Sequence, residues 1–356
     1  MKAYVLHGID ELKYEEILVP DIRADEVLIK VHAAGICGSD IPRIYKTGTY
    51  SYPLIPGHEF SGEVVKVGRD VDNSWMGKRV GIFPLIPCQK CIPCQNKQYE
   101  LCRHYSYLGS RTNGGFAEYV AVPEWNLIEL PQNVTYEQAA MLEPMSVAVH
   151  AMRRACENIV DSKGKVVVYG LGTIGILLTM YLKEAGFHNI LVIGNKDFQK
   201  KMIIGLGIDG KNFCDNREET AYKWIMEKTD NLGADVVFEC VGRAETINDA
   251  VMCAAPGATV QLVGNPASDI CFDKNIYWKI LRNQLTVLGS WNSSFCHDEQ
   301  DDWHYVINKL QRGQIHPENF ITHKLPFSEL EKGLQLMRDK TEEYVKIMIN
   351  KKLQCD

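Results

Sequence analysis

The pattern of apolar and polar positions divides the chain into stretches of different character. Residues 1–148 carry short runs in which apolar and polar residues alternate, such as 26–31 and 62–68, and each run is bounded by Gly, Pro or Asp. Alternation is typical of a strand with one buried face, because successive side chains of a strand point to opposite sides. This part of the chain is therefore predicted to form a small antiparallel β domain, such as a partly open barrel.

From about residue 149 the runs become continuously apolar and alternate with helical stretches. Continuous apolar strands indicate a parallel sheet that helices cover on both faces, as in a doubly wound α/β fold. The predicted strands are 165–169, 189–193, 234–238, 258–263 and 285–288.

The end of the chain is mixed in character again. A helical pattern near 328–338 precedes a last apolar strand at 344–349, and we expect this strand to return to the first domain. The predicted organisation is a β-rich domain made of 1–148 and 291–356, and a doubly wound domain made of 149–290.

Composition narrows the possible functions. The chain has 356 residues, 46% of them hydrophobic and 24% charged, which is typical of a soluble globular protein of two domains. A net charge of −6 without a basic run argues against nucleic-acid binding, and the apolar stretches are too short to span a bilayer. The first residues resemble a strand and not a secretory signal, so we expect a cytoplasmic protein without stable disulfides.

Four of the twelve cysteines lie close together, as Cys88-x2-Cys91-x2-Cys94-x7-Cys102. Thiolates at this spacing can converge on one point, and the usual occupant is a tetrahedral Zn²⁺. An iron–sulfur cluster, disulfides or a buried apolar cluster are the alternatives. The sequence predicts a structural zinc lobe over residues 86–103, and such a closed site stabilises a loop without doing chemistry.

A glycine-rich loop follows the first predicted strand of the doubly wound domain. It has the sequence Gly170-Leu171-Gly172-Thr173-Ile174-Gly175 and opens an apolar helix. In this context the first glycine permits a tight turn, the second lets the backbone approach a pyrophosphate, and the third allows close packing of helix on strand. The loop is therefore predicted to bind a dinucleotide.

The end of the next strand bears on the choice of dinucleotide. NAD-binding units usually place an acidic residue there for the ribose 2′-hydroxyl, but this chain has Gly194-Asn195-Lys196. The missing carboxylate removes repulsion against a 2′-phosphate, and Lys196 could pair with that phosphate. The sequence favours NADP(H), while NAD(H) stays open because Asp197 could reach the ribose from a shifted loop.

Three further segments each offer one good zinc ligand beside turn residues, namely Cys37, His58 and Glu143. Taken singly, each has an ordinary structural explanation, since a core thiol, a loop histidine and a turn carboxylate are all common.

Several motifs, however, occur together and in a familiar order. They are Gly-Ile-Cys-Gly-Ser-Asp at 35–40, Gly-His-Glu-Phe-Ser-Gly at 57–62, the cysteine lobe, Gly-Gly-Phe-Ala-Glu-Tyr at 114–119, Glu-Pro-Met-Ser-Val at 143–147 and the glycine loop. Over essentially its whole length the chain resembles the zinc-dependent medium-chain alcohol/polyol dehydrogenases, and within them the sorbitol dehydrogenase-like branch. Residues 37–44 and 288–291 are particularly similar to the galactitol-1-phosphate 5-dehydrogenases.

The resemblance implies a GroES-like catalytic domain and a Rossmann domain with the active site between them. It implies that Cys37, His58 and Glu143 hold a catalytic zinc, so that two zinc ions bind per chain, and that Glu59 is an occasional ligand or contacts the ligands. Zinc would lower the pKa of the substrate hydroxyl, Ser39 would accept its proton, and hydride would pass to the nicotinamide. Pro42 stands where many relatives keep a histidine for proton relay, which puts that relay in doubt.

Substrate and assembly are further expectations. Arg43, Lys46 and Arg111 could clamp a phosphate, so the expected substrate is a polyol phosphate such as galactitol 1-phosphate. An unphosphorylated polyol such as sorbitol, or L-threonine, is the enzyme alternative, and a non-catalytic dinucleotide-binding protein is the alternative from another class. The strand at 285–288 would form a sheet edge, and a long apolar edge is usually covered. In the family that the chain resembles this edge pairs across a dimer, so the expected assembly is a homodimer or homotetramer.

Overall fold

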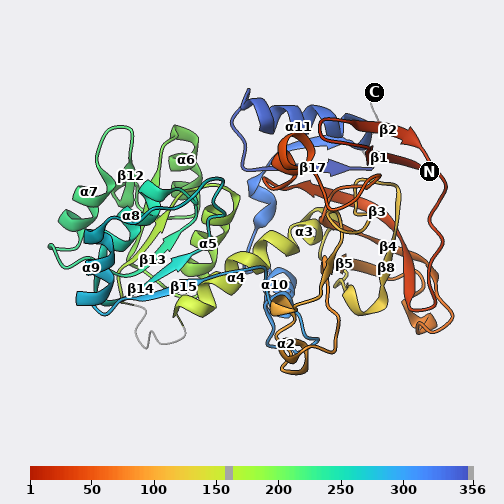
Figure 1. Cartoon of the computed structure of the whole chain (residues 1–356), viewed down its shortest axis with the longest axis horizontal. Helices are drawn as coiled ribbons and strands as arrows, with labels where there is room; N and C mark the ends of the chain where they lie inside the picture. The colour runs from red at the N-terminus through yellow and green to blue at the C-terminus, as the bar shows by residue number, and fades with distance from the viewer. Residues whose placement is uncertain (157–162, 352–356) are drawn as a thin grey trace. The chain divides into compact units, whose positions relative to one another are not determined.

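The computed structural model describes residues 1–156 and 163–351 (Figure 1). It divides into two compact units: unit 1 consists of Met1–Glu143 with Ser294–Asp356, and unit 2 of Pro144–Ser293. The predicted boundaries, 148/149 and 290/291, lie within a few residues of these. The first differs because one helix, α4 (Leu142–Cys156), runs through the boundary, so the change in sequence pattern does not coincide with an end of an element.

Unit 2 contains a six-stranded parallel sheet with the order β12-β11-β10-β13-β14-β15. Numbered along the chain, this is the 3-2-1-4-5-6 order of a doubly wound dinucleotide-binding fold. The five predicted strands are present, and the sequence missed only β12. The strands are β10 Val166–Tyr169, β11 Ile190–Gly194, β12 Phe213–Asp215, β13 Ala234–Glu239, β14 Ala254–Leu262 and β15 Thr286–Gly289.

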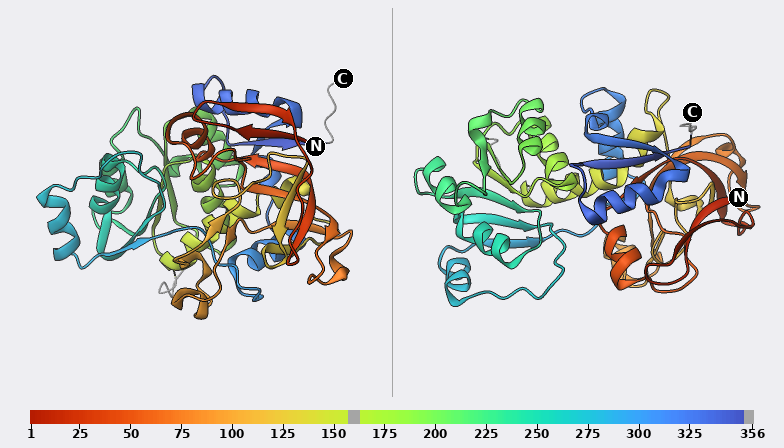
Figure 2. Two further views of the ribbon diagram at one scale, coloured as in Figure 1. Left: turned by 45° about the vertical axis from the view of Figure 1, so that its right-hand side comes forward. Right: turned by 90° about the horizontal axis from the view of Figure 1, so that it is seen from above.

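Helices cover both faces of this sheet, as Figures 1 and 2 show. On one face Val167 and Tyr169 of β10 belong to an apolar cluster with Trp224 of α7 and Val251 of α8. Helix α5 packs on β10 and β11 and begins directly after the glycine loop. The helices are α5 Thr173–Glu184, α6 Asp197–Gly205, α7 Ala221–Lys228, α8 Ala244–Met252 and α9 Lys274–Arg282, with the 3₁₀ turn η5 Gly210–Asn212.

Unit 1 is built on a seven-stranded sheet in which β16-β17-β3-β4-β5-β9 are neighbours and β8 also pairs with β3. Two strand pairs, β1 with β2 and β6 with β7, stand beside it. The strands are β1 Lys2–Leu6, β2 Leu12–Glu16, β3 Glu26–Ile36, β4 Glu59–Val67, β5 Arg79–Ile82, β6 Leu85–Ile86, β7 Ser106–Tyr107, β8 Tyr119–Pro123, β9 Leu127–Glu129, β16 Ile321–Pro326 and β17 Lys346–Asn350.

The last strand returns to the first domain, as predicted. β17 pairs antiparallel with β3, with Ile347 opposite Ile36, and the helix α11 (Leu330–Asp339) buries Leu330 and Leu334 in the same core. The blue and red segments that lie together in Figure 1 are these two ends of the sequence.

Short helical segments complete unit 1. Two of them, α1 (Asp40–Pro42) and the π-helical turn η1 (Arg43–Thr47), follow β3 directly. The others are α2 Ile92–Gln95, α3 Tyr136–Ala140, α10 Asp302–Gln311, and the 3₁₀ turns η2 Asn73–Trp75, η3 Tyr99–Leu101, η4 Glu124–Asn126, η6 Pro317–Phe320 and η7 Phe327–Glu329. Among the residues described, no helix combines the length and the apolar composition needed to span a bilayer.

Candidate functional site: two metal clusters and a dinucleotide loop

The predicted cysteine lobe forms a compact cluster of four sulfur atoms. The Sγ atoms of Cys88 and Cys94 lie 4.0 Å apart, those of Cys91 and Cys94 3.5 Å, and those of Cys91 and Cys102 3.9 Å. A tetrahedron of thiolates around Zn²⁺ at ~2.3 Å requires sulfur separations of about 3.8 Å. A disulfide needs about 2.05 Å, so these spacings fit a metal site and not a pair of bridges.

A second group of possible ligands forms where two neighbouring strands meet. β3 ends at Ile36, one residue before Cys37, and β4 begins at Glu59, one residue after His58. Because β3 and β4 are antiparallel, with Gly35 opposite Glu59, the end of one strand lies beside the start of the other. Ligand atoms of Cys37, His58 and Glu59 lie within 4.8 Å of one another. From the sequence, Glu59 is expected only as an occasional ligand or as a residue that contacts the ligands.

Asp40 orients this group. Its side chain is fully buried; Oδ2 accepts a hydrogen bond of 3.0 Å from the backbone N–H of Cys37, and Oδ1 lies 3.4 Å from Nδ1 of His58. The contact at Nδ1 leaves Nε2 of His58 for a metal, an arrangement that fixes ring orientation in many zinc sites. Burial alone would raise the pKa of Asp40, but His58, Arg43 and the Cys37 N–H together hold it below its usual value.

A buried lysine lies on the other side of the group. Lys346 of β17 is 2% exposed, forms an ion pair with Glu59, and donates a hydrogen bond of 3.2 Å to the carbonyl oxygen of Ile36. Burial opposes its charge, yet Glu59, Cys37 and Glu143 raise the pKa of Lys346 above the usual value.

Glu143, the third predicted ligand, lies outside the group of three. Its Oε1 is 3.3 Å from the hydroxyl of Tyr107, which donates to it, and the ring of Tyr107 meets that of His58 edge-on at 5.9 Å. Burial raises the pKa of Glu143 to about 7, with His58 opposing the rise and Glu59 adding to it. Glu143 therefore lies next to the group formed by Cys37, His58 and Glu59, which is called the metal cluster below, and the charges of this group shift its pKa.

The charge balance tests whether a divalent cation fits here. On a bound metal the ligands are deprotonated, so Cys37 would be a thiolate, His58 neutral and Glu143 a carboxylate, and the site would hold four negative groups, Cys37, Asp40, Glu59 and Glu143. Its two cations are Arg43, which pairs with Asp40, and Lys346. Two of the four negative charges stay uncompensated, which is the charge that Zn²⁺ would neutralise.

The glycine loop of unit 2 has the predicted backbone features. Gly170 has φ +95°, which favours glycine, and a Cβ at Gly175 would lie 1.9 Å from the Gly170 carbonyl oxygen, so helix α5 packs closely on the loop. A Cβ at Gly172 would meet no described atom within 4 Å, so this position borders open space. Thr173 and Ile174 begin α5, and the N-terminus of a helix attracts a phosphate through its backbone N–H groups and its dipole.

Gln199 connects the end of β11 with the glycine loop, a contact that the sequence alone does not predict. Gln199 accepts a hydrogen bond of 3.0 Å from the Asn195 N–H and donates one of 2.9 Å to the Leu171 carbonyl oxygen. A Cβ at Gly194 would lie 2.7 Å from its Oε1. The lack of a side chain at Gly194 thus leaves space for Gln199, whose side chain bridges the end of β11 and the glycine loop.

The charges around that corner are mixed. Arg217 forms ion pairs with both Asp197 and Asp215, so Asp197 already has a cationic partner. Lys196 is half-buried and lies 5.4 Å from the ring centroid of Phe198.

Comparisons with known protein families identify the group to which the chain belongs. Residues 23–132 match the alcohol dehydrogenase GroES-like domain, and residues 173–312 match the zinc-binding dehydrogenase domain. The chain belongs to the zinc-dependent medium-chain dehydrogenases. The predicted fold, a GroES-like domain with a Rossmann domain, is confirmed. The predicted zinc-dependent, nicotinamide-linked chemistry is confirmed at the level of the family.

Individual relatives of this dehydrogenase differ in substrate. It is 32% identical over 342 residues to galactitol 1-phosphate 5-dehydrogenase of Escherichia coli (strain K12), covering 95% of this chain and 96% of that one. It is 33% identical over 344 residues to L-threonine 3-dehydrogenase of Bacillus licheniformis, with the same coverage. A zinc-binding dehydrogenase of Sinorhizobium meliloti 1021 bound to NADP superposes with TM-score 0.88 at 26% identity, over 98% of both chains. Such identities leave the substrate open.

The three cations predicted to clamp a phosphate have different surroundings. Arg43 pairs with the buried Asp40 at 2.6 Å, while Lys46 is exposed. The guanidinium of Arg111 lies 4.3 Å from the ring centroids of both Tyr50 and Tyr105. Of these three cations, only Arg111 therefore has a guanidinium that is held in place and makes no ion pair with an acidic residue among those described.

The polar partners of the metal cluster were the hardest features to find from sequence. Asp40 could have been found from its place three residues after Cys37, on the same turn. Lys346 had one signal, a lysine in the middle of the apolar run 344–349. Tyr107 had none.

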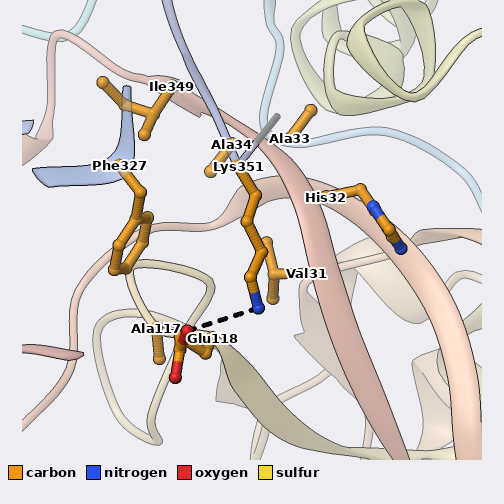
Figure 3. A pocket seen from close by; sticks show the side chains of 9 residues that line it. All are labelled: Val31, His32, Ala33, Ala34, Ala117, Glu118, Phe327, Ile349 and Lys351. Carbon is orange, nitrogen blue, oxygen red and sulfur yellow. Dashed lines mark ion pairs between the residues drawn. The ribbon is translucent and has the colours of Figure 1, made fainter. Parts of the chain in front are cut away.

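Unit 1 also contains a hollow that is unrelated to the metal cluster (Figure 3). Val31 and Phe327 are among its apolar walls, and Lys351 and Glu118 form an ion pair of 3.4 Å across it. None of the candidate metal ligands lines it, so we assign it no part in the reaction.

Proposed function

We propose that this dehydrogenase oxidises a secondary alcohol of a polyol phosphate to the ketone, with galactitol 1-phosphate as the first candidate. The observation that carries the proposal is the arginine at 111. Its guanidinium is held between Tyr50 and Tyr105, and Nη1 donates a hydrogen bond of 3.1 Å to the Tyr105 carbonyl oxygen. A guanidinium fixed by stacking loses little freedom when it binds a phosphate.

Ring contacts link Arg111 to the metal cluster. The ring of Tyr105 packs edge-on against that of Tyr107 at 6.4 Å, and Tyr107 in turn contacts His58. Two aromatic rings, those of Tyr105 and Tyr107, therefore connect Arg111 with His58, and the arginine is a suitable partner for a charged group on the far end of a substrate. The 32% identity to a galactitol 1-phosphate dehydrogenase supports the same substrate class.

The proposed ligands of the catalytic zinc are Cys37 and His58 together with Glu143, and Glu59 is the alternative carboxylate. Zinc, when bound, acts as a Lewis acid that makes the substrate hydroxyl more acidic. Asp40 keeps the imidazole of His58 turned for ligation. Lys346 holds Glu59 by an ion pair, so Glu143 is proposed as the carboxylate that binds the metal.

Ser39 is proposed to accept the proton of the substrate hydroxyl. Its Oγ lies 3.4 Å from Sγ of Cys37, so a hydroxyl group stands directly beside a ligand atom. Because Pro42 has no proton to transfer, the onward path would run through the cofactor ribose or water. We expect Ser39→Ala to lower kcat about 100-fold or more, and unchanged turnover would remove Ser39 from the mechanism.

The proposed cofactor is NADP(H). Gly194 provides no carboxylate for a 2′-hydroxyl, Lys196 is available as a cation, and Asp197 is engaged by Arg217. Among similar structures one holds NADP and another NADH, so the proposal rests on these residues of the chain.

The proposed assembly is a homodimer in which two β15 strands pair. β15 is the end strand of the sheet and Val287 is 40% exposed, so a second copy of the strand would continue the sheet across a twofold axis. Val287→Lys should give monomers in light-scattering measurements, whereas Leu232→Lys, at an exposed leucine of unit 2 outside β15, should not. A dimer that withstands Val287→Lys would refute this arrangement.

The decisive experiment compares substrates. Turnover of galactitol 1-phosphate, galactitol, sorbitol and L-threonine is measured with NAD⁺ and with NADP⁺. We expect the phosphorylated polyol to have the highest kcat/KM, and Arg111→Met to raise its KM about 10–100-fold while leaving that of galactitol unchanged. Arg338→Met is the matched control, because Arg338 also stacks on a tyrosine, Tyr45, at 4.7 Å.

Equal effects of Arg111→Met on phosphorylated and free polyol would show that this arginine is no phosphate anchor. Preference for L-threonine would favour the activity of the B. licheniformis relative instead. Wild-type protein that binds a single zinc and turns over none of these substrates would favour a non-catalytic dinucleotide-binding protein.

A further inference from the structure

Arg43 has a surrounding that a substrate-binding cation would not need. It follows Asp40 by three residues, on the helical turns α1 and η1, so the two side chains lie on the same face. Nη1 of Arg43 is 2.6 Å from Oδ1 of Asp40. The carboxylate has no exposed surface, and the arginine side chain is only 18% exposed.

We infer that Arg43 is a positioning residue of the metal cluster, which holds Asp40 so that Asp40 can orient Cys37 and His58. This inference rests on the proposed zinc ligands. It replaces the expectation that Arg43 clamps the phosphate of the substrate.

The side-chain carboxylate of Asp40 contacts three groups. Oδ2 of Asp40 fixes the backbone of Cys37, and Oδ1 faces both Nδ1 of His58 and the guanidinium of Arg43. Of these three groups, only Arg43 always carries a positive charge. A buried carboxylate needs such a partner to stay both charged and fixed.

Loss of the guanidinium would leave Asp40 with weaker partners on the Oδ1 side. The carboxylate could then turn away from His58, and the imidazole would lose the contact that keeps its other nitrogen directed at the metal. Groups that contact metal ligands from behind in this way commonly contribute 10–100-fold to zinc affinity.

The test measures metal retention in the full-length protein. Wild type is compared with Arg43→Met, with Arg43→Gln, which keeps an N–H donor, and with Arg43→Lys, which keeps the charge. Arg69→Met is the matched control, because Arg69 pairs with Asp70 at 3.8 Å on the surface of the same unit. Zinc per chain is determined by elemental analysis, and the release rate is followed with a chromogenic chelator.

We expect two zinc ions per wild-type chain, one of which is lost about 10–100-fold faster from Arg43→Met. The release rate of Arg43→Gln should be intermediate, Arg43→Lys should restore most of the retention, and Arg69→Met should match wild type. With Co²⁺ in place of the labile zinc, the visible absorption of Arg43→Gln should differ from that of wild type. Should Arg43→Met fail to fold, Arg43→Gln decides the question.

Substrate kinetics separate positioning from clamping. A positioning role predicts that Arg43→Gln lowers kcat/KM for phosphorylated and free polyols by the same factor. Wild-type zinc release from Arg43→Gln, with a KM increase confined to the phosphorylated substrate, would overturn the inference and restore the clamp. A single zinc in the wild-type protein would overturn the proposed function itself, and this inference with it.

Discussion

The buried ion pair between Lys346 and Glu59 gives the sharpest prediction for stability. Both side chains are at most 2% exposed, and Lys346→Met would remove the cation while leaving the carboxylate beside Cys37. Breaking one partner of a buried pair commonly costs about 3–5 kcal/mol, because an uncompensated charge stays in the interior. For a unit of about 200 residues this corresponds to a fall in Tm of roughly 6–20 °C.

The assay is calorimetric unfolding of zinc-loaded and chelator-treated protein. We expect the larger deficit after chelation, since a bound Zn²⁺ can take over the role of Lys346 toward Glu59. Lys351→Met is the matched control: Lys351 pairs with Glu118 at 3.4 Å but is 30% exposed, so its loss should cost at most about 1 kcal/mol.

A second substitution checks the cause. In the Lys346→Met background, Glu59→Gln removes the stranded charge and should recover part of the lost stability. Equal Tm values for Lys346→Met and Lys351→Met, or a further loss on adding Glu59→Gln, would refute the reasoning that an unpaired buried charge is the source of the effect.

Three other predictions address the remaining sites. Gly175→Ala should destabilise unit 2 and abolish cofactor binding, because the new Cβ would lie 1.9 Å from a loop carbonyl oxygen. Gly172→Ala should fold normally and raise only the KM for the cofactor. Calorimetry measures the stability of both variants, and kinetics measures the KM. Cys91→Ser should reduce zinc by one ion per chain in elemental analysis, with lower thermal stability. The pKa of His304 is raised above 6.5 mainly by its hydrogen bond to Asp301. His304→Gln should therefore lower the Tm most below pH 6.5. The difference in Tm from wild type should vanish as the pH rises through the raised pKa.

Most of the fold could be read from sequence because its signals are local and repeated. The continuous apolar strands and the glycine loop specify the doubly wound unit, and the cysteine spacing specifies the lobe. β12 was missed because it has only three residues, Phe213–Asp215, too few for a pattern. The boundary at 148 was displaced because α4 continues through it.

The site was predicted less completely, since its parts depend on pairing between distant strands. The register of β3 with β4 brings Glu59 to Cys37, and the return of β17 brings Lys346 to Glu59. Neither pairing can be read from spacing. The sequence predicts Arg43 as a phosphate-binding residue because its charge is visible there, whereas its ion pair with Asp40 is seen only in the structure.

The bridge made by Gln199 limits how cofactor preference can change during evolution. A carboxylate at position 194 would collide with this amide, whose two hydrogen bonds tie Asn195 to Leu171. A mutation of Gly194 alone would therefore damage the phosphate loop before any benefit at the ribose appeared. Phe213 and Leu171 also lie within 3.1 Å of a Cβ at this position, so a carboxylate at 194 would require several neighbouring side chains to change with it.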